Sequence, residues 1–295
     1  MDNTRSEVLR YAAFTDSGKG GNPAGVVLDA RSLSEADMLA IAREVGYSET
    51  AFVLPTLEPS GFQVRYFSPK SEVAFCGHAT VAAAVALAER DGPGARDFTT
   101  LAGLVTVNAV ADEHSVTATL TSPGTRTRPV TEPALGAALA AIGWERDDLD
   151  PAYPAHVAFA GNDHLVLGVS KQITLATLDY DFDQLSALME REQWTTVHMF
   201  WAEQDGVFHV RNAFPPGGVV EDPATGAAAA AFGGYLRSLG LVTIPARLTL
   251  LQGTQMGSPS RLIVDIDAHT DTVRVTGSAS RMPLQFVEAP LNGLV

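Results

Sequence analysis

Four side chains of this 295-residue chain have chemistry suited to moving a proton, and each lies beside a turn or an apolar run. Glu49 precedes the apolar segment 51–54, where a carboxylate can take a proton from carbon and return it. Cys76 and His78 come just before one alanine-rich segment, and Asp222 comes just before a second. Acid, base and thiol groups of this kind are typical of proton transfer that needs no metal ion.

Each of the four residues also has a purely structural interpretation. Glu49 can be a solvent-exposed residue at the start of a strand, and His78 a hydrogen-bonded histidine at the start of a helix. Asp222 can be a helix N-cap, a common role for aspartate that is compatible with a catalytic one. For Cys76 the sequence favours a small buried residue over a reactive thiol.

Other kinds of chemistry find no support in the sequence. Segment 18–21 lacks the spacing of a phosphate-binding loop, and no Gly-x-Ser-x-Gly motif is present. The seven histidines are scattered without the close spacing of a metal-ligand pair, and a single cysteine excludes an intrachain disulfide. We therefore expect no metal and no nicotinamide, flavin or pyridoxal phosphate cofactor.

Composition limits the partners of the chain. Hydrophobic residues make up 46% and charged residues 18%, which is enough apolar surface for sizeable cores. The net charge of −14 argues against nucleic acid as a partner. The longest apolar, uncharged run, 134–144, is far shorter than a membrane span, and the polar residues 1–5 do not resemble a signal peptide. These features predict a cytoplasmic protein, and the net negative charge does not exclude a small anionic substrate.

An internal repeat indicates how the chemical groups are positioned. Segments 64–84 and 210–230 align without gaps at an offset of 146, and each reads as a strand ending in Val-Arg, a proline-containing loop, a small-residue turn and an alanine-rich helix. Chance is the alternative, since alanine and valine are common. The repeat predicts two similar domains, 1–125 and 126–295, and leaves open that the last strand crosses back to the first domain.

The two alanine-rich helices, expected near 79–90 and 225–239, are apolar all round and should be buried all round. A sheet curled around a central helix would bury them. Their starts, at 77–80 and 224–227, offer free N–H groups and the positive end of the helix dipole, which can hold a carboxylate.

The remaining elements follow from hydrophobic periodicity and from turn residues. Further helices are predicted from Ser34 to Val45 and over 134–142, and a linker over 121–133. Strands are predicted at 7–14, 24–29, 51–54, 62–67, 99–108, 114–120, 155–160, 164–169, 196–202, 206–213, 246–251, 261–266 and 272–278.

Four ordered motifs resemble those of one known family. They are Gly-Asn-Pro-Ala-Gly at 21–25, Ser-Glu-Thr at 48–50, Phe-Cys-Gly-His-Ala-Thr at 75–80 and Glu-Asp-Pro-Ala-Thr-Gly at 221–226. Together they are similar to the motifs of the phenazine-biosynthesis (PhzF-like) isomerases, and the resemblance spans the chain. It implies the diaminopimelate-epimerase-like fold, an α/β (α+β) architecture of two similar domains. Each domain is a mixed, curled sheet or barrel around a central helix, and the active site lies between them.

The resemblance also implies an activity and its residues. In the best-understood family member, the glutamate of the Ser-Glu-Thr motif moves a proton during isomerisation of 2,3-dihydro-3-hydroxyanthranilate. The matching catalytic residues here are Glu49, His78 and Asp222. A homodimer is expected by the same analogy. The residues expected to bind a carboxylate-bearing substrate are Asn22, Gly77, Ala79, Thr80, Thr225, Gly226, Ala227, Gln252 and Gly253.

Two departures from the family pattern bear on the substrate. Ala227 stands where the phenazine enzyme has serine, and Ser258 stands where family members often have arginine. Both argue against the phenazine substrate and for a different or smaller anion. The second half contains no cysteine, so a two-thiol racemase is excluded. An epimerase that pairs Cys76 with a non-thiol acid, and a binding protein without turnover, remain the alternatives.

Overall fold

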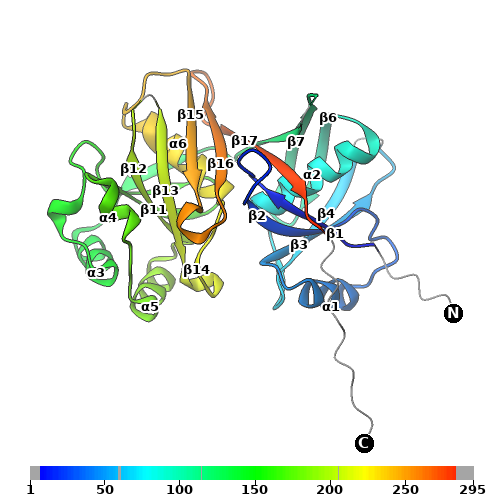
Figure 1. Ribbon diagram of the computed structural model, residues 1–295, viewed down its shortest axis with the longest axis horizontal. Helices are drawn as coiled ribbons and strands as arrows, with labels where there is room; N and C mark the ends of the chain where they lie inside the picture. Colours follow the sequence, from blue (N-terminus) through cyan, green and yellow to red (C-terminus); the bar gives the residue numbers. More distant parts are fainter. Residues whose placement is uncertain (1–6, 59–60, 114, 205, 284–295) are drawn as a thin grey trace, which may run out of the picture.

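The computed structural model describes residues 7–58, 61–113, 115–204 and 206–283, which form two lobes side by side (Figure 1). The strands of both lobes belong to one continuous sheet of 17 strands. In each lobe this sheet curls around one helix, α2 in the first and α6 in the second. The predicted mixed α+β fold with a helix at the centre of each sheet is confirmed.

The first lobe is a closed barrel of eight strands. Its elements are β1 (Leu9–Ala13), β2 (Asn22–Val27), α1 (Glu35–Val45), β3 (Glu49–Pro55), β4 (Gly61–Phe67), β5 (Glu72–Val73), α2 (Gly77–Asp91), β6 (Gly94–Thr100), β7 (Gly103–Ala111) and β8 (Val116–Thr121). The barrel order is β1–β2–β3–β4–β6–β7–β8, and β17 (Val273–Arg281) closes the circle by pairing with both β8 and β1. The β2/β3 and β4/β6 pairs are parallel.

The second lobe repeats the strand order of the first without closing into a barrel, since β9 pairs with β10 at one edge of the described sheet. Its elements are β9 (Arg126–Pro129), α3 (Glu132–Ile142), β10 (His156–Phe159), β11 (Asp163–Val169), α4 (Gln172–Ala176), α5 (Phe182–Glu192), β12 (Thr196–Ala202), β13 (Val207–Phe214), β14 (Val219–Glu221), α6 (Gly226–Ser238), β15 (Ala246–Gln252) and β16 (Ser260–Ile266). The order is β9–β10–β11–β12–β13–β15–β16–β17, with β11/β12 and β13/β15 parallel. When β10 is matched with β1, the two parallel pairs of the second lobe correspond to those of the first lobe.

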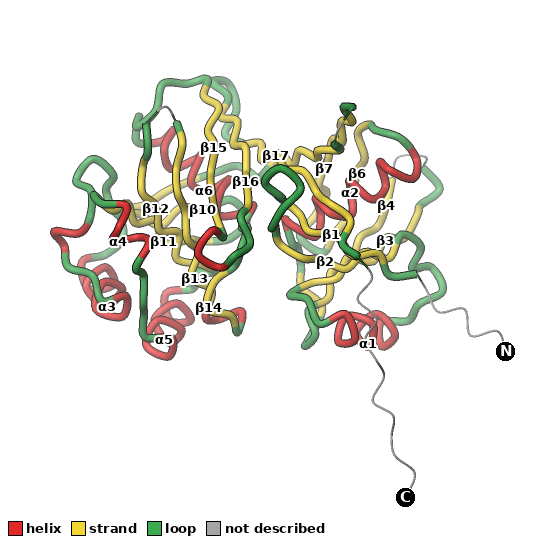
Figure 2. Tube along the Cα trace, viewed as in Figure 1, coloured by secondary structure: helices red, strands yellow, loops and turns green. Residues whose placement is uncertain are grey.

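Strand β17 belongs to both lobes (Figure 2). Its first residues, from Val273 to Thr276, pair with β16 of the second lobe. The overlapping stretch from Arg274 to Ser278 pairs with β8, and the end from Ala279 to Arg281 pairs with β1. A single strand therefore connects the two lobes through main-chain hydrogen bonds.

The central helices are enclosed by their sheets. Every residue of α2 from His78 to Ala88 is buried, and α6 is buried over most of its length. Small residues allow this close approach: a Cβ on Gly234 would meet Thr125 at 2.4 Å, and one on Gly233 would meet Val264 at 2.9 Å. The observed enclosure confirms the burial predicted from the sequence, because a helix that is apolar on every face is stable only when every face is covered.

The other helices cover the outer faces of the two sheets. Helix α1 packs against β3 and β4, and α3, α4 and α5 lie along the outer side of the second lobe (Figure 1). Helix α1 begins after Ser34, whose hydroxyl accepts a hydrogen bond from the Asp37 N–H, and it ends at the left-handed Gly46. The helix predicted from Ser34 to Val45 is confirmed.

Two sequence predictions need correction, and two helices were not predicted. The strand predicted at 99–108 is wrong, because the chain reverses at Leu101 and Ala102, and Gly103 adopts a φ of +112° that other residues rarely adopt. The linker predicted at 121–133 contains β9, which pairs with β10. Helices α4 and α5 were not predicted, although α5 has an aspartate N-cap, Asp181. In the part of the chain that the structure describes, no helix has the length and apolar character needed to cross a membrane.

Candidate active site

The starts of the two central helices meet between the lobes. A Cβ placed on Gly77, the first residue of α2, would lie 3.7 Å from the Cα of Gly226 and 3.8 Å from the nitrogen of Ala227, at the start of α6. Neither helix start has a side-chain oxygen cap. Two sets of main-chain N–H groups and two positive dipole ends therefore converge, which favours an anionic group at this point.

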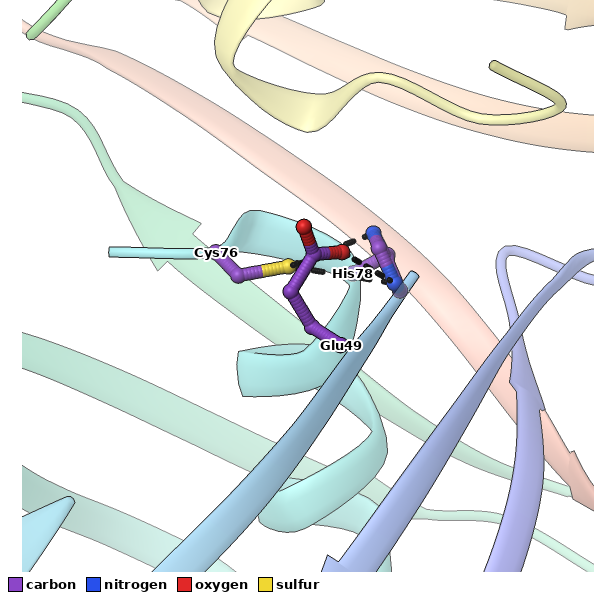
Figure 3. Close-up of side chains that lie close together, drawn as sticks. All are labelled: Glu49, Cys76 and His78. Atoms are coloured by element: carbon purple, nitrogen blue, oxygen red, sulfur yellow. Dashed lines mark hydrogen bonds and ion pairs between the residues drawn. The ribbon is translucent and has the colours of Figure 1, made fainter. Parts of the chain in front are cut away.

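The first lobe brings three reactive side chains to this meeting point (Figure 3). Glu49 begins β3, Cys76 precedes α2, and His78 is the second residue of α2. The Glu49 Oε2 atom lies 3.4 Å from Cys76 Sγ and 3.4 Å from His78 Nε2. The Cys76 sulfur is in turn 3.3 Å from His78 Nδ1. Carboxylate, thiol and imidazole thus form one compact cluster.

Burial keeps the Cys76 thiol protonated. Loss of solvation raises its pKa well above the ordinary value, and the nearby negative charge of Glu49 raises the pKa further. A hydrogen bond from the Ala79 N–H to the sulfur acts in the opposite direction, and its effect is smaller. The thiol therefore donates a hydrogen bond to the Glu49 carboxylate.

The second lobe contributes Asp222, which lies in the turn between β14 and α6. Its Oδ1 accepts a hydrogen bond of 2.6 Å from Asn22 Nδ2, and its Oδ2 accepts one of 2.6 Å from the Thr225 hydroxyl. Burial raises the pKa of this carboxyl, although His78 and the two hydrogen bonds oppose the shift. Asp222 is the acidic group that the second lobe presents to the cluster.

Asn22 connects the two lobes and contacts His78. Its Nδ2 donates to Asp222 Oδ1 and to the Ala224 carbonyl at 3.1 Å, and it lies 3.2 Å from His78 Nδ1. Because the amide nitrogen carries only two hydrogens, which Asp222 and Ala224 accept, its contact with Nδ1 does not assign the ring tautomer, and the other ring nitrogen is Nε2. That nitrogen faces Ser48 Oγ at 3.4 Å and the Glu49 carboxylate.

Gln252 holds the start of α6 in place. Its Oε1 accepts a hydrogen bond from the Thr225 N–H at 3.2 Å, and its Nε2 donates to the Asp222 carbonyl at 2.6 Å. Gln252 is buried, and the adjacent Gly253 packs so tightly that a Cβ would lie 2.8 Å from the Pro223 carbonyl. Both residues shape the turn that carries Asp222.

Most of the predicted site residues gather at this point, and two face elsewhere. The side chains of Ala79 and Thr80 point into the first barrel, where the Thr80 hydroxyl donates to the Cys76 carbonyl and contacts the Tyr66 hydroxyl. The residues that the structure brings together around the two helix starts are Asn22, Glu49, Gly77, His78, Asp222, Thr225, Gly226, Ala227, Gln252 and Gly253.

An arginine–glutamate pair stands at the same place in each lobe. Arg65 on β4 donates to both oxygens of Glu72 on β5, at 2.6 Å each. Arg211 on β13 pairs in the same way with Glu221 on β14, through Nε at 2.9 Å and through Nη2. Glu221 directly precedes Asp222, so the second pair anchors the strand that presents the acid.

These pairs correct the alignment of the repeat. The two arginines are 146 residues apart, whereas Glu221 follows Glu72 by 149, and Gly226 follows Gly77 by 149. The difference falls in the loop between β13 and β14, which contains a short 3₁₀ helix, Pro215–Gly217. The ungapped offset of 146 therefore holds for β4 and β13, and it is wrong by three residues from β5 and β14 to the starts of α2 and α6.

Sequence reasoning missed two further residues near the site. Ser48 belongs to the Ser-Glu-Thr motif but was not singled out, although its hydroxyl lies close to His78. Phe14 has a left-handed φ of 61° and is fully buried, and its ring touches the positions where Cβ atoms on Gly226 and Gly277 would lie. Nothing in the sequence around Phe14 indicates this role between the lobes.

Solved structures with the same architecture define the class of fold. The chain matches a PhzF-family phenazine biosynthesis protein from Bacillus anthracis with a TM-score of 0.83 and 26% identity, over 94% of this chain and 96% of that one. It also matches a probable proline racemase from Agrobacterium radiobacter with a TM-score of 0.65, over 97% and 94% of the two chains. At 13% identity the racemase shows the fold alone. The fold is shared by PhzF-type proteins and proline racemases.

The sequence comparison gives the family within that class. The family model described as "Phenazine biosynthesis-like protein" matches residues 11–282. The chain is 32% identical to the uncharacterized isomerase YddE of Escherichia coli, over 93% of this chain and 96% of YddE. It is 30% identical to the uncharacterized isomerase YfhB of Bacillus subtilis, over the same shares. The chain belongs to the phenazine biosynthesis-like family, as its motifs predicted.

Proposed function

We propose that this protein is an isomerase that moves a proton on a small carboxylate-bearing substrate by general acid–base catalysis, without a cofactor. One observation carries the proposal: Glu49 lies 3.4 Å from the His78 imidazole at the point where two helix starts converge. The carboxylate of Glu49, a candidate general base, therefore lies beside two helix starts that are suited to binding an anion. The isomerase names of the relatives from E. coli and B. subtilis agree with this class of reaction.

The reaction is a proton shift along the substrate. The substrate carboxylate is held by free N–H groups of Gly77, Gly226 and Ala227, which places a neighbouring C–H bond near Glu49. Glu49 takes the proton, and the electron pair of the C–H bond forms a new double bond while the existing double bond moves along. Glu49 then returns the proton to the far carbon, so that no atom is gained or lost.

His78 and Asp222 stabilise the charge that develops during this shift. His78 donates its Nε2–H toward Glu49, which orients the carboxylate. Asp222, with its raised pKa, can present a proton from the opposite lobe to the electron-rich substrate. Asn22 couples the two groups through its hydrogen bond to Asp222 and its contact with His78.

The substrate we propose is not the phenazine intermediate. Ala227 and Ser258 supply neither the serine hydroxyl nor the arginine found at these places in related proteins. In the described structure the substrate carboxylate would rely on main-chain N–H groups. This favours a small anion with one carboxylate over a larger polar ring.

One contact favours a second candidate, an epimerase that uses Cys76. The thiol lies 3.4 Å from Glu49 and 3.3 Å from His78, either of which can accept its proton. The matching position at the start of α6 is Thr225, whose hydroxyl donates to Asp222. Asp222 would then be the second acid, acting on the opposite face of the substrate carbon.

Proton exchange in heavy water tests both candidates. The wild type and Glu49→Gln would be incubated with a panel of small cyclic and amino-bearing carboxylates, and deuterium uptake would be followed by mass spectrometry. We expect uptake on at least one compound, reduced about 10²- to 10⁴-fold by Glu49→Gln, the usual contribution of a general base. Glu190→Gln, on the exposed side of α5, is the matched control.

The outcomes separate the alternatives. Uptake that survives Glu49→Gln and disappears on alkylation of Cys76 would replace the isomerase proposal with the epimerase. A folded wild type that exchanges no compound while binding one of them would identify a binding protein.

A further inference from the structure

The cluster of Glu49, Cys76 and His78 contains three different donor atoms at nearly equal separations. Glu49 Oε2 lies 3.4 Å from Cys76 Sγ and 3.4 Å from His78 Nε2, and Sγ lies 3.8 Å from the same Nε2 (Figure 3). All three belong to ordered elements, since Glu49 begins β3 and the other two flank the start of α2. The triangle is therefore a property of the folded lobe.

These separations match one face of a tetrahedral zinc site. Zinc lies about 2.3 Å from sulfur, about 2.0 Å from imidazole nitrogen and about 2.1 Å from carboxylate oxygen, which places neighbouring donors about 3.4 to 3.6 Å apart. The three donors would bind one ion with only small side-chain adjustments. Sequence spacing had indicated no metal-ligand pair, because Glu49 is distant in the sequence from Cys76 and His78.

The charge around the cluster also favours a cation. Glu49 and Asp222 are both acidic, and Cys76 becomes anionic when it loses its proton. Within the described residues, the hydrogen bonds and ion pairs of these three side chains involve no lysine or arginine. A divalent cation would supply the missing positive charge.

We infer that Glu49, Cys76 and His78 capture a thiophilic divalent cation such as Zn²⁺, and that the ion inhibits the enzyme. On binding, the Cys76 S–H bond breaks and its proton goes to solvent, while the neutral His78 ring carries its proton on Nδ1. The lone pairs of the sulfur and of Nε2 then form the bonds to the metal. Thiolate and imidazole favour Zn²⁺ and Co²⁺ over Mg²⁺ and Ca²⁺, which prefer oxygen donors. The metal is a regulator here and has no part in the proposed reaction.

Inhibition follows because the ion engages the lone pair that Glu49 needs to accept a proton. This half of the inference rests on the proposed function, whereas the binding half does not. Zn²⁺ should suppress deuterium exchange, and a chelator should restore it.

Cobalt binding tests the site without reference to turnover. The EDTA-treated protein would be titrated with Co²⁺ while near-ultraviolet absorbance is recorded, because a cobalt–thiolate bond gives a charge-transfer band. Cys76 is the only cysteine of the chain, so any such band reports this site. We expect a band that saturates at one ion per chain, disappears in Cys76→Ser, and is displaced by Zn²⁺ but not by Mg²⁺.

Matched variants separate the three ligands from a general loss of structure. Glu49→Gln and His78→Asn should each weaken Co²⁺ binding at least ten-fold, with an unchanged circular dichroism spectrum. Glu203→Gln is the control, because Glu203 and His209 form another glutamate–histidine pair, 2.8 Å apart, that contains no thiol. A folded wild type without the band, or undiminished affinity in Glu49→Gln, would overturn the metal site.

The exchange assay, run in EDTA and then in Zn²⁺, distinguishes failure of this inference from failure of the proposed function. Exchange in EDTA without a cobalt band rejects the metal site and leaves the isomerase. A cobalt band without any exchange rejects the isomerase and leaves the metal site. Exchange that Zn²⁺ increases, or that Zn²⁺ suppresses equally in wild type and Cys76→Ser, rejects inhibition through this cluster.

Discussion

The starts of α2 and α6 are equivalent positions of a duplicated fold, yet their side chains differ in kind. Matching Gly77 with Gly226 places Cys76 opposite Thr225 and His78 opposite Ala227. The first lobe has a thiol and an imidazole where the second has a hydroxyl and a methyl group. The comparison teaches that both helix starts kept free main-chain N–H groups, while the thiol and the imidazole lie at the first helix start alone.

The two arginine–glutamate pairs that anchor the neighbouring strands differ in burial, and here the second lobe has the more buried charged groups. The side chains of Arg211 and Glu221 are 9% and 7% exposed, whereas those of Arg65 and Glu72 are 21% and 18% exposed. In the second lobe the buried charged pair therefore stabilises the strand next to Asp222. The first lobe places its titratable groups at the site and leaves its pair closer to solvent.

The largest expected difference between the lobes comes from breaking these pairs one at a time. Glu221→Gln leaves Arg211 buried without its counter-charge, which should lower the free energy of unfolding by about 3–5 kcal/mol. Glu72→Gln should cost about 1 kcal/mol or less, because water and Glu35 remain available to Arg65. Urea unfolding followed by tryptophan fluorescence measures the first change, because all three tryptophans lie between residues 144 and 201.

Glu72→Gln would be followed by circular dichroism, which reports both lobes. Equal losses of stability in the two variants would contradict the difference in burial between the pairs.

Acid should destabilise the second lobe through two buried histidines. Burial lowers the pKa of His164 and of His198 to about 3. Below about pH 6.5 the two histidines bind a proton in the unfolded chain but not in the folded one. The stability is therefore fully present above that pH and is lost as the pH falls toward 3. Between those two pH values, each histidine should lower the free energy of unfolding by about 1.4 kcal/mol for every pH unit of acidification.

His164→Gln and His198→Gln should each reduce this slope in urea unfolding monitored by tryptophan fluorescence at pH 6.5 to 4.5. The control is His269→Gln, at an exposed position. A slope that survives both substitutions would show that other groups account for acid sensitivity.

A smaller effect is expected at the turn that presents Asp222. Gln252→Ala removes the side chain that binds both the Thr225 N–H and the Asp222 carbonyl, which should cost about 1–3 kcal/mol of stability. Proton exchange should fall as well, because Asp222 loses its fixed position. Gln193→Ala, at the exposed end of α5, is the control. Full exchange in Gln252→Ala would show that the turn holds its shape without this side chain.

The smallest expected change restores a hydroxyl to the second helix start. Ala227→Ser should alter stability by less than about 0.5 kcal/mol, because the position is half-buried at the edge of the site. If the N–H groups of α6 hold the substrate, the added hydroxyl should strengthen carboxylate binding by about 1 kcal/mol, roughly five-fold. Calorimetric titration with a compound that exchanges deuterium measures this. Unchanged affinity would place the carboxylate elsewhere.

Much of this arrangement could be predicted from the sequence because its signals are local. Ser34 and Gly46 delimit α1 by capping, and the apolar alanine-rich segments required enclosure. The four motifs identified Glu49, His78 and Asp222, which the structure gathers around the two helix starts. What each of these residues does in turnover stays a prediction.

The remaining features depend on contacts between distant segments. The contact of Asn22 with His78 joins residues 56 apart, and its bond to Asp222 joins residues 200 apart. The left-handed Phe14 and the pairing of β9 with β10 likewise follow from packing between elements and have no local pattern. Composition and periodicity carry no information about such pairs, so the donor triangle around Glu49 became visible only in the folded chain.

Strand β17 has a consequence for how the protein is made. The first barrel closes only when the segment from Arg274 to Arg281, near the end of the described chain, pairs with β8 and β1. Synthesis proceeds from the N-terminus, and domains often fold as they emerge from the ribosome. Here the earlier-made half must wait, with the edges of β1 and β8 unpaired, until the later half has been translated. The lobe that carries Glu49, Cys76 and His78 is therefore the last to be completed.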